Sequence, residues 1–161
     1  MLNFKENLDP FMVGRRVNSE EWNTITRTMQ AADDTVRLGF GVPVKSGTLN
    51  YTCLEITSTT GEQFLGITEA MPTLPRPGDA GYARYDEVPV CEEGVIAVPT
   101  EGNVTEGAPA RWNTATKKWT AAAQSATVVT IPGVIFEIDA TAPGVAPIRL
   151  RKTVPSNTVS G

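Results

Sequence analysis

The chain has 161 residues, of which 40% are hydrophobic and 20% charged, and its formal net charge is −4. This composition is that of one ordinary globular domain and excludes a disordered, highly charged segment. The 14 basic residues are scattered along an acidic chain, so no basic stripe indicates a nucleic-acid partner. No run reaches the roughly 18 apolar residues of a membrane span, and the first residues do not read as a signal peptide.

The first 36 residues differ from the rest and predict an irregular N-terminal arm. Four of its apolar residues follow no clear period, namely Phe4, Leu8, Phe11 and Met12. Apolar residues exposed on an arm usually pack on something, so these four are the predicted partner-binding residues. Packing of the same side chains on the protein's own body is an equally good interpretation of the pattern.

The segment from residue 19 to 32 fits two structures. As a helix it would have Asn18 as its N-cap and would place Trp22, Ile25 and Met29 on one face. As a strand it would carry threonine on one side, at every second position from 24 to 28. A strand is slightly favoured, because β-branched threonines weaken a helix.

From Val36 onward the pattern predicts only strands and turns. The predicted elements are a hairpin of 51–57 and 63–68 turning around Gly61, strands 85–90 and 94–99 turning at Glu92-Glu93-Gly94, a hairpin at 110–120, and strands in 127–139 and 146–152. About eight short strands with frequent turns indicate an all-β small barrel or sandwich. The predicted division is an arm at 1–36, a β-barrel body at 37–152 and a flexible tail at 153–161.

The hairpin at 110–120 carries two tryptophans. Trp112 and Trp119 would pack across its two arms, with residues 113–117 as the turn. The same tryptophans, with Tyr82 and Tyr85, could instead form a flat aromatic platform for sugar rings, as in carbohydrate-binding modules. Cross-strand packing is the more common arrangement of such a pair.

Side chains that would carry out catalysis are missing or isolated. The chain has no histidine, which removes histidine-based acid–base catalysis, the usual zinc ligands and Ser-His-Asp triads. Neighbouring acids such as Glu92-Glu93 point to opposite faces of a strand or into solvent, so a small hydrolase is a weak alternative. Cys53 and Cys91 predict two buried thiols, with a disulfide between them as the alternative. The sequence therefore predicts no catalytic residue, no metal ligand and no cofactor.

Several short motifs follow one another in a definite order. They are LGFGVPV (38–44), Cys53 in a strand, GEQFLGI (61–67), YDEVPV (85–90), GVIAVP (94–99), NVTEGAPARW (103–112) and IPGVIFEID (131–139). Their order and spacing resemble those of the structural cement, or capsid decoration, proteins of tailed bacteriophages. The resemblance covers residues 36–152.

The resemblance implies an all-β body, a small barrel or tulip, without enzymatic activity. Such a protein would bind the outer surface of the shell formed by the major capsid protein and stabilise the expanded head. It would self-associate, by preference as a trimer, because capsid lattices offer threefold sites. It would lie on the exterior of the virion capsid after synthesis in the cytoplasm of the bacterial host. A carbohydrate-binding or receptor-recognition module of a virion is the alternative function.

Overall fold

The computed structural model describes residues 12–18, 21–57, 61–71, 81–141 and 144–151. These residues form nine strands and no helix. In chain order the strands are β1 (Asn23–Met29), β2 (Pro43–Ser46), β3 (Thr52–Glu55), β4 (Phe64–Thr68), β5 (Glu87–Thr100), β6 (Pro109–Asn113), β7 (Lys118–Thr120), β8 (Val128–Phe136) and β9 (Gly144–Leu150). The prediction of an all-β fold is confirmed.

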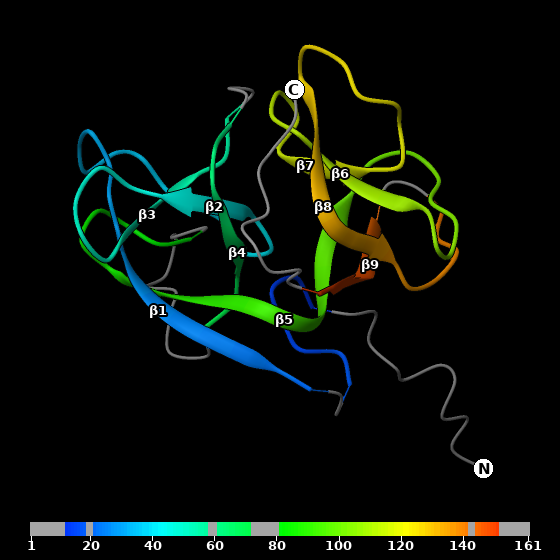
Figure 1. The fold of residues 1–161 in the computed structure, drawn as a ribbon, viewed down its shortest axis with the longest axis horizontal. Helices are drawn as coiled ribbons and strands as arrows, with labels where there is room; N and C mark the ends of the chain where they lie inside the picture. Colours follow the sequence, from blue (N-terminus) through cyan, green and yellow to red (C-terminus); the bar gives the residue numbers. More distant parts are fainter. Residues whose placement is uncertain (1–11, 19–20, 58–60, 72–80, 142–143, 152–161) are drawn as a thin grey trace.

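The strands form two rings that lie side by side and share strand β5 (Figure 1). The first ring runs through β1, β3, β2, β4 and the first half of β5, which pairs again with β1. In the second ring the other half of β5 pairs with β9, followed by β8, β6 and β7. A single parallel pair, Thr100 with Trp119, joins β7 back to β5. The small barrel expected from the sequence is thus built as two adjoining rings.

Strand β5 is 14 residues long and passes from one ring to the other between Glu93 and Gly94. Glu93 still pairs with Asn23 of β1, whereas Gly94 pairs with Leu150 of β9. The predicted turn at Glu92-Glu93-Gly94 is therefore wrong. Both halves of the strand find partner strands of their own, so an extended backbone satisfies more hydrogen bonds there than a turn would. Gly94 supplies the bend with a φ of 135°, which favours glycine.

Strand β2 lies between β3 and β4, and Val44 of β2 pairs with Glu55 of β3 and with Gly66 of β4. The predicted hairpin of residues 51–57 with 63–68 is therefore wrong. Local turn chemistry around Gly61 suggested direct pairing. The short strand β2 takes the position between the two segments, and no local signal reports such a long-range insertion.

The segment that fitted both a helix and a strand is a strand, β1. It pairs with β3 and β5, and Met29 at its end is buried while Ile25 packs against the core. This part of the predicted arm therefore belongs to the wall of the first ring. Residues 1–11 and the predicted tail at 153–161 lie outside the described residues, and the boundaries of arm, body and tail stay a prediction.

Each ring buries apolar side chains of its own strands. Ile67 and Val90 are fully buried in the first ring, and Trp112, Trp119 and Phe136 are fully buried in the second. Burying a side chain of this size contributes about 1.5–3 kcal/mol to stability. These side chains belong to one hydrophobic core cluster, which packs both rings.

A hydrogen bond and an ion pair also join the rings beyond the shared strand. The indole Nε1 of Trp119 donates a hydrogen bond of 2.7 Å to the carbonyl oxygen of Gly41, which leads into β2. The ammonium of Lys117, in the β6–β7 turn, forms an ion pair of 2.5 Å with Glu55 of β3. The rings are thus held together by a buried hydrogen bond and a more exposed ion pair.

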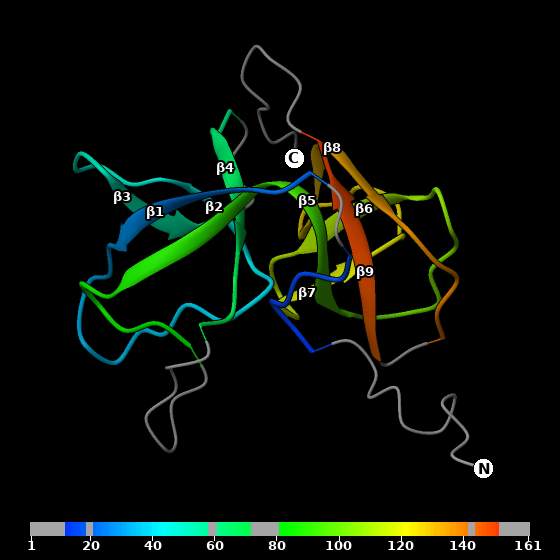
Figure 2. The ribbon, with the colours of Figure 1, turned by 90° about the horizontal axis from the view of Figure 1, so that it is seen from below.

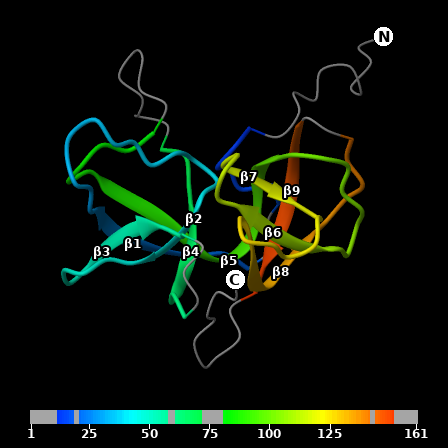
Figure 3. The ribbon, with the colours of Figure 1, turned by 90° about the horizontal axis from the view of Figure 1, so that it is seen from above.

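Residues 12–18 run along strand β5 on the edge that β9 does not occupy. The amide of Gly14 donates to the carbonyl of Ala97, Ala97 donates to Arg15, and Val17 donates to Val95. Figures 2 and 3 show this segment, in dark blue, beside the second ring. Strand β7 pairs with β5 only at Thr100, so most of this edge of β5 would otherwise be open. The N-terminal segment occupies the edge and protects it from pairing with another strand.

Candidate interaction surface

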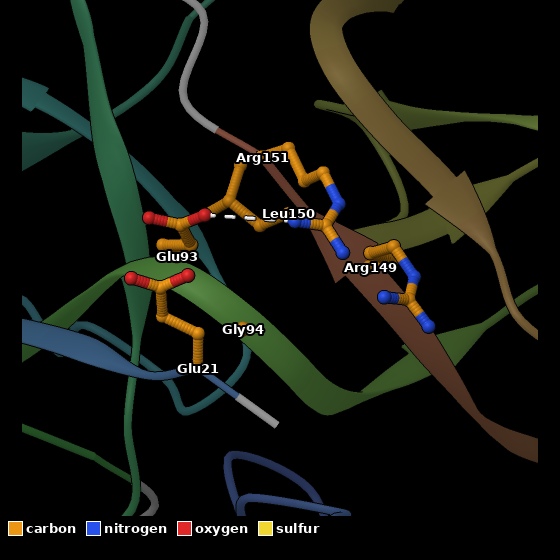
Figure 4. A pocket seen from close by; sticks show the side chains of 6 residues that line it. All are labelled: Glu21, Glu93, Gly94, Arg149, Leu150 and Arg151. Atoms are coloured by element: carbon orange, nitrogen blue, oxygen red, sulfur yellow. Dashed lines mark ion pairs between the residues drawn. The ribbon is translucent and has the colours of Figure 1, made fainter.

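Charged side chains line a cleft at the junction of the two rings. This cleft, of about 210 Å³, is lined by Glu21, Glu93, Gly94, Arg149, Leu150 and Arg151 (Figure 4). Arg151 lies 3.7 Å from Glu93, and Arg149 forms hydrogen bonds of 2.5 and 2.8 Å with Glu137. The ion pair of Arg151 with Glu93 therefore ties the residue after β9 to β5, and the ion pair of Arg149 with Glu137 ties β9 to the residue after β8.

The described part of the chain offers no metal-binding group of three or more cysteine or acidic side chains. None of the described residues forms a helix long and apolar enough to cross a membrane. Glu93 in the junction cleft pairs with Arg151, and the pKa of nearby Glu137 is lowered mainly by its hydrogen bond with Arg149. This arrangement fits structural ion pairing.

Both cysteines are buried and unlinked, which confirms the prediction of two buried thiols. Burial raises the pKa of Cys53 to about 11 and raises that of Cys91 still further. A thiol held protonated in an apolar environment is a poor nucleophile. Cys53 and Cys91 are therefore packing residues.

The proposed aromatic platform for sugars is wrong. Trp112, Trp119 and Tyr82 are fully buried, and Tyr85 alone of the four is exposed. The two indoles pack edge to face across β6 and β7, with ring centres 5.6 Å apart, as the cross-strand interpretation predicted. Tyr82 packs against Phe40 and donates its hydroxyl to the carbonyl of Glu69. Burial in the core removes these rings from any ligand.

Most of the exposed large apolar side chains lie in the connections of the first ring. Among the described residues, six large apolar side chains are exposed: Met12, Val36, Leu49, Tyr51, Tyr85 and Ile135. Four of them, Val36, Leu49, Tyr51 and Tyr85, lie in the connections of the first ring between β1 and β2, β2 and β3, and β4 and β5. We call these four residues the tyrosine end.

Backbone hydrogen bonds hold the two tyrosines on either side of the last residues of β1. Thr28 donates its amide to the carbonyl of Tyr51, and Tyr85 donates its amide to the carbonyl of Met29. The amides of Thr48 and Leu49 both donate to the side-chain oxygen of Gln30, at distances of 2.9 and 3.4 Å. The three loops are therefore fixed relative to one another by bonds to a single strand and the residue after it.

An arginine stacks on each tyrosine ring. The guanidinium of Arg27 lies 5.7 Å from the centre of the Tyr51 ring, and that of Arg84 lies 4.7 Å from the centre of the Tyr85 ring. A mainly apolar groove of about 250 Å³, lined in part by Val36, adjoins this end. The tyrosine end thus combines apolar area, aromatic rings and guanidinium groups, the side chains most enriched at protein interfaces.

Sequence reasoning placed partner binding in the arm and missed this surface. Phe4, Leu8 and Phe11 lie outside the described residues, and Met12 is 60% exposed. The signal that could have found the tyrosine end is an aromatic residue inside a polar turn. Tyr51 follows Leu49-Asn50, and Tyr85 stands between Arg84 and Asp86. Both tyrosines were instead read as the first residues of strands.

Comparison with known proteins decides the family. The model of the family described as structural cement protein (E217 gp24/Pam3 gp6) matches residues 2–151. This chain belongs to the structural cement protein family. A solved chain from the capsid of Myoviridae phage XM1 shares the fold of this family member, with a TM-score of 0.74 at 16% sequence identity over 91% of this chain and 94% of that chain. None of the curated proteins compared with the chain matches it.

Membership in the structural cement family confirms the resemblance seen in the sequence. The chain is a phage structural protein with a capsid-stabilising role, associated with the capsid shell in the virion. The carbohydrate-binding alternative is not favoured, because its aromatic platform is buried.

Proposed function

We propose that this chain binds the outer surface of the shell formed by the major capsid protein and stabilises the expanded head. The observation that carries the proposal is the family match over residues 2–151. Two rings stiffened by one packed core suit a protein that acts through shape. A protein that binds only the assembled shell stabilises it by mass action, without any reacting group.

The proposal includes the oligomer and the place of action. The chain self-associates, by preference as a trimer, so that several weak contacts with the shell add up through avidity. It is made in the cytoplasm of the bacterial host and then occupies the exterior of the capsid. It binds neither nucleic acid nor membranes and has no enzymatic activity.

Co-sedimentation with expanded heads of the phage that encodes the chain tests the proposal. The purified chain is expected to pellet with expanded heads and not with unexpanded ones, and to raise the temperature at which expanded heads break open. Analytical ultracentrifugation of the chain alone measures the oligomer, for which a trimer is expected. A chain that binds neither the heads nor itself contradicts the proposal.

The arm has its own test within the same experiment. Residues 14–17 pair with β5, so a deletion that reached them would expose a strand edge. Deleting only residues 1–11 removes Phe4, Leu8 and Phe11 while sparing this pairing. The truncated chain is expected to bind expanded heads more weakly while its thermal unfolding midpoint stays unchanged. Equal binding by the truncated and full chains would remove the arm from the proposed interface.

A further inference from the structure

We propose that residues 12–18 form a strap that locks the two rings together, and that firm binding to the capsid shell depends on this strap. The first half of the inference stands on the contacts of the strap alone, and the second half rests on the proposed function. The strap lies beside β5, and its backbone forms hydrogen bonds with residues of both rings (Figure 2). The arm at residues 1–11 continues into the strap, so the strap joins the arm to the folded body.

Gly14 connects the strap to both rings. Its amide donates a hydrogen bond of 2.7 Å to the carbonyl of Ala97, in the half of β5 that belongs to the second ring. Its carbonyl accepts a hydrogen bond of 2.8 Å from the amide of Ala70, which follows β4 of the first ring. Moving one ring against the other would have to break one of these bonds. Gly14 is buried, so a backbone group that lost its partner there would be costly.

The seat of the strap accepts only glycine at position 14. Gly14 has a φ of 77°, in the left-handed region that favours glycine. A β-carbon built on it would come within 2.7 Å of the amide nitrogen of Ala70 and within 2.8 Å of the β-carbon of Phe40. Both atoms are fixed to the backbone of the first ring and cannot swing aside as the end of a long side chain can. The strap therefore seats in one register.

Two further contacts extend the lock. A β-carbon built on Gly41 would come within 3.2 Å of the Val13 side chain, so this residue of the strap lies over Gly41. The carbonyl of Gly41 accepts the hydrogen bond from Trp119 that joins the rings. Arg16 of the strap stacks on the indole of Trp22, which covers the bend in β5. The strap thus reaches the bond between the rings and the bend of the strand that they share.

A protein held on a shell by several weak contacts gains from such a lock. Weak contacts add up when one body holds them at fixed separations, because each loose joint adds conformational freedom that binding must remove. The strap also fixes the place from which the arm leaves the body, and so the separation between contacts made by the arm and by the rings. Releasing the strap is therefore expected to weaken binding to the shell without changing any contact residue.

The first test is Gly14→Ala in the full chain, with Gly102→Ala as the matched control. Gly102 also has a positive φ, of 67°, but a β-carbon built on it meets no described atom within 4 Å. Hydrogen exchange of the Ala97 amide, which donates to the carbonyl of Arg15, reports whether the strap is seated. The amide of Val104, bonded within the second ring, serves as the reference for the rest of the fold.

In Gly14→Ala the Ala97 amide is expected to exchange at least about tenfold faster than in the parent and the control, with less change at Val104. The same variant is expected to bind expanded heads at least about tenfold more weakly than either. Exchange of Ala97 at the parent rate would overturn the strap. Equal acceleration at Ala97 and Val104 would also overturn it, because the substitution would then loosen the whole fold.

Val17→Pro keeps the inference testable if Gly14→Ala fails to fold. Proline removes the amide that donates a hydrogen bond of 3.0 Å to the carbonyl of Val95, and it leaves the seat of Gly14 unchanged. This variant is expected to speed the exchange of the Ala97 amide and to weaken head binding, both by smaller factors. Head binding equal to that of the parent, in a variant whose Ala97 amide exchanges fast, would overturn the dependence of binding on the strap. A parent chain that does not bind expanded heads would contradict the proposed function, while the exchange rates would still decide the strap, so the two failures are distinguishable.

Discussion

Trp22 lies directly against Gly94, at the point where strand β5 passes from the first ring to the second. A β-carbon built on Gly94 would come within 2.3 Å of the indole atom Cε3 of Trp22. The guanidinium of Arg16 stacks on the same indole, 5.4 Å from the ring centre. The indole thus covers the bend in the shared strand and ties the N-terminal segment to it.

Gly94→Ala is expected to destabilise the chain, because the added methyl group clashes with the indole of Trp22. Overpacking of this kind costs about 1–3 kcal/mol of unfolding free energy. Urea unfolding followed by tryptophan fluorescence measures the change. Gly102→Ala is the matched control, since Gly102 also has a positive φ but has no atom within 4 Å of a built β-carbon. A loss no larger than that of the control would contradict the clash.

Trp119→Phe is expected to cost more stability than Trp112→Phe. Both indoles are fully buried and pack on each other, so the two substitutions remove similar volumes. Trp119 also donates to Gly41, whereas the Nε1 of Trp112 has no hydrogen-bond partner among the described residues. Losing the donor leaves the carbonyl of Gly41 unsatisfied, which adds about 1–3 kcal/mol to the cost. Equal unfolding free energies for the two variants would show that the bond between the rings contributes nothing.

The ion pair of Glu137 with Arg149 makes stability depend on acidity. The pKa of Glu137 is lowered in the folded chain from an ordinary value of 4.5, chiefly by the hydrogen bonds that Arg149 donates. The stabilising contribution is therefore complete above pH 4.5 and is lost as the pH falls through the lower, folded pKa. Glu137→Gln is expected to remove this part of the dependence below pH 4.5, as measured by urea unfolding at a series of pH values. Identical pH profiles for parent and variant would contradict the prediction.

Cys53 and Cys91 are expected to resist thiol reagents in the native chain. Both thiols are fully buried, and burial raises the pKa of each. A colourimetric thiol titration should find no reactive cysteine in buffer and two in unfolding concentrations of urea. The rate of modification should follow the opening of the fold. Fast reaction of either thiol in buffer would show that its surroundings open locally.

The sequence predicts correctly those parts of the fold that depend on residues close together in the chain. The hairpin of Trp112 and Trp119 follows from its turn and from the cross-strand pair, and it forms as expected. The alternation of threonines correctly favoured a strand for β1. In both cases each residue's conformation follows from its immediate neighbours, which the sequence displays directly.

The wrong predictions concern parts of the fold that depend on contacts between residues far apart in the chain. The turn at Gly94 is absent because the two halves of β5 pair with different strands. The tyrosine end was missed because the exposure and positive φ of Tyr51 and Tyr85 depend on hydrogen bonds to the end of β1. Such contacts arise only when distant segments meet.

The sequence by itself determined an all-β chain without histidine, and its order of motifs indicated the family. Only the tertiary structure decided that the strands close into two rings around one shared strand and which apolar residues stay at the surface. The physical reason is that turn and strand preferences are local, whereas ring closure and exposure depend on pairings across the whole chain.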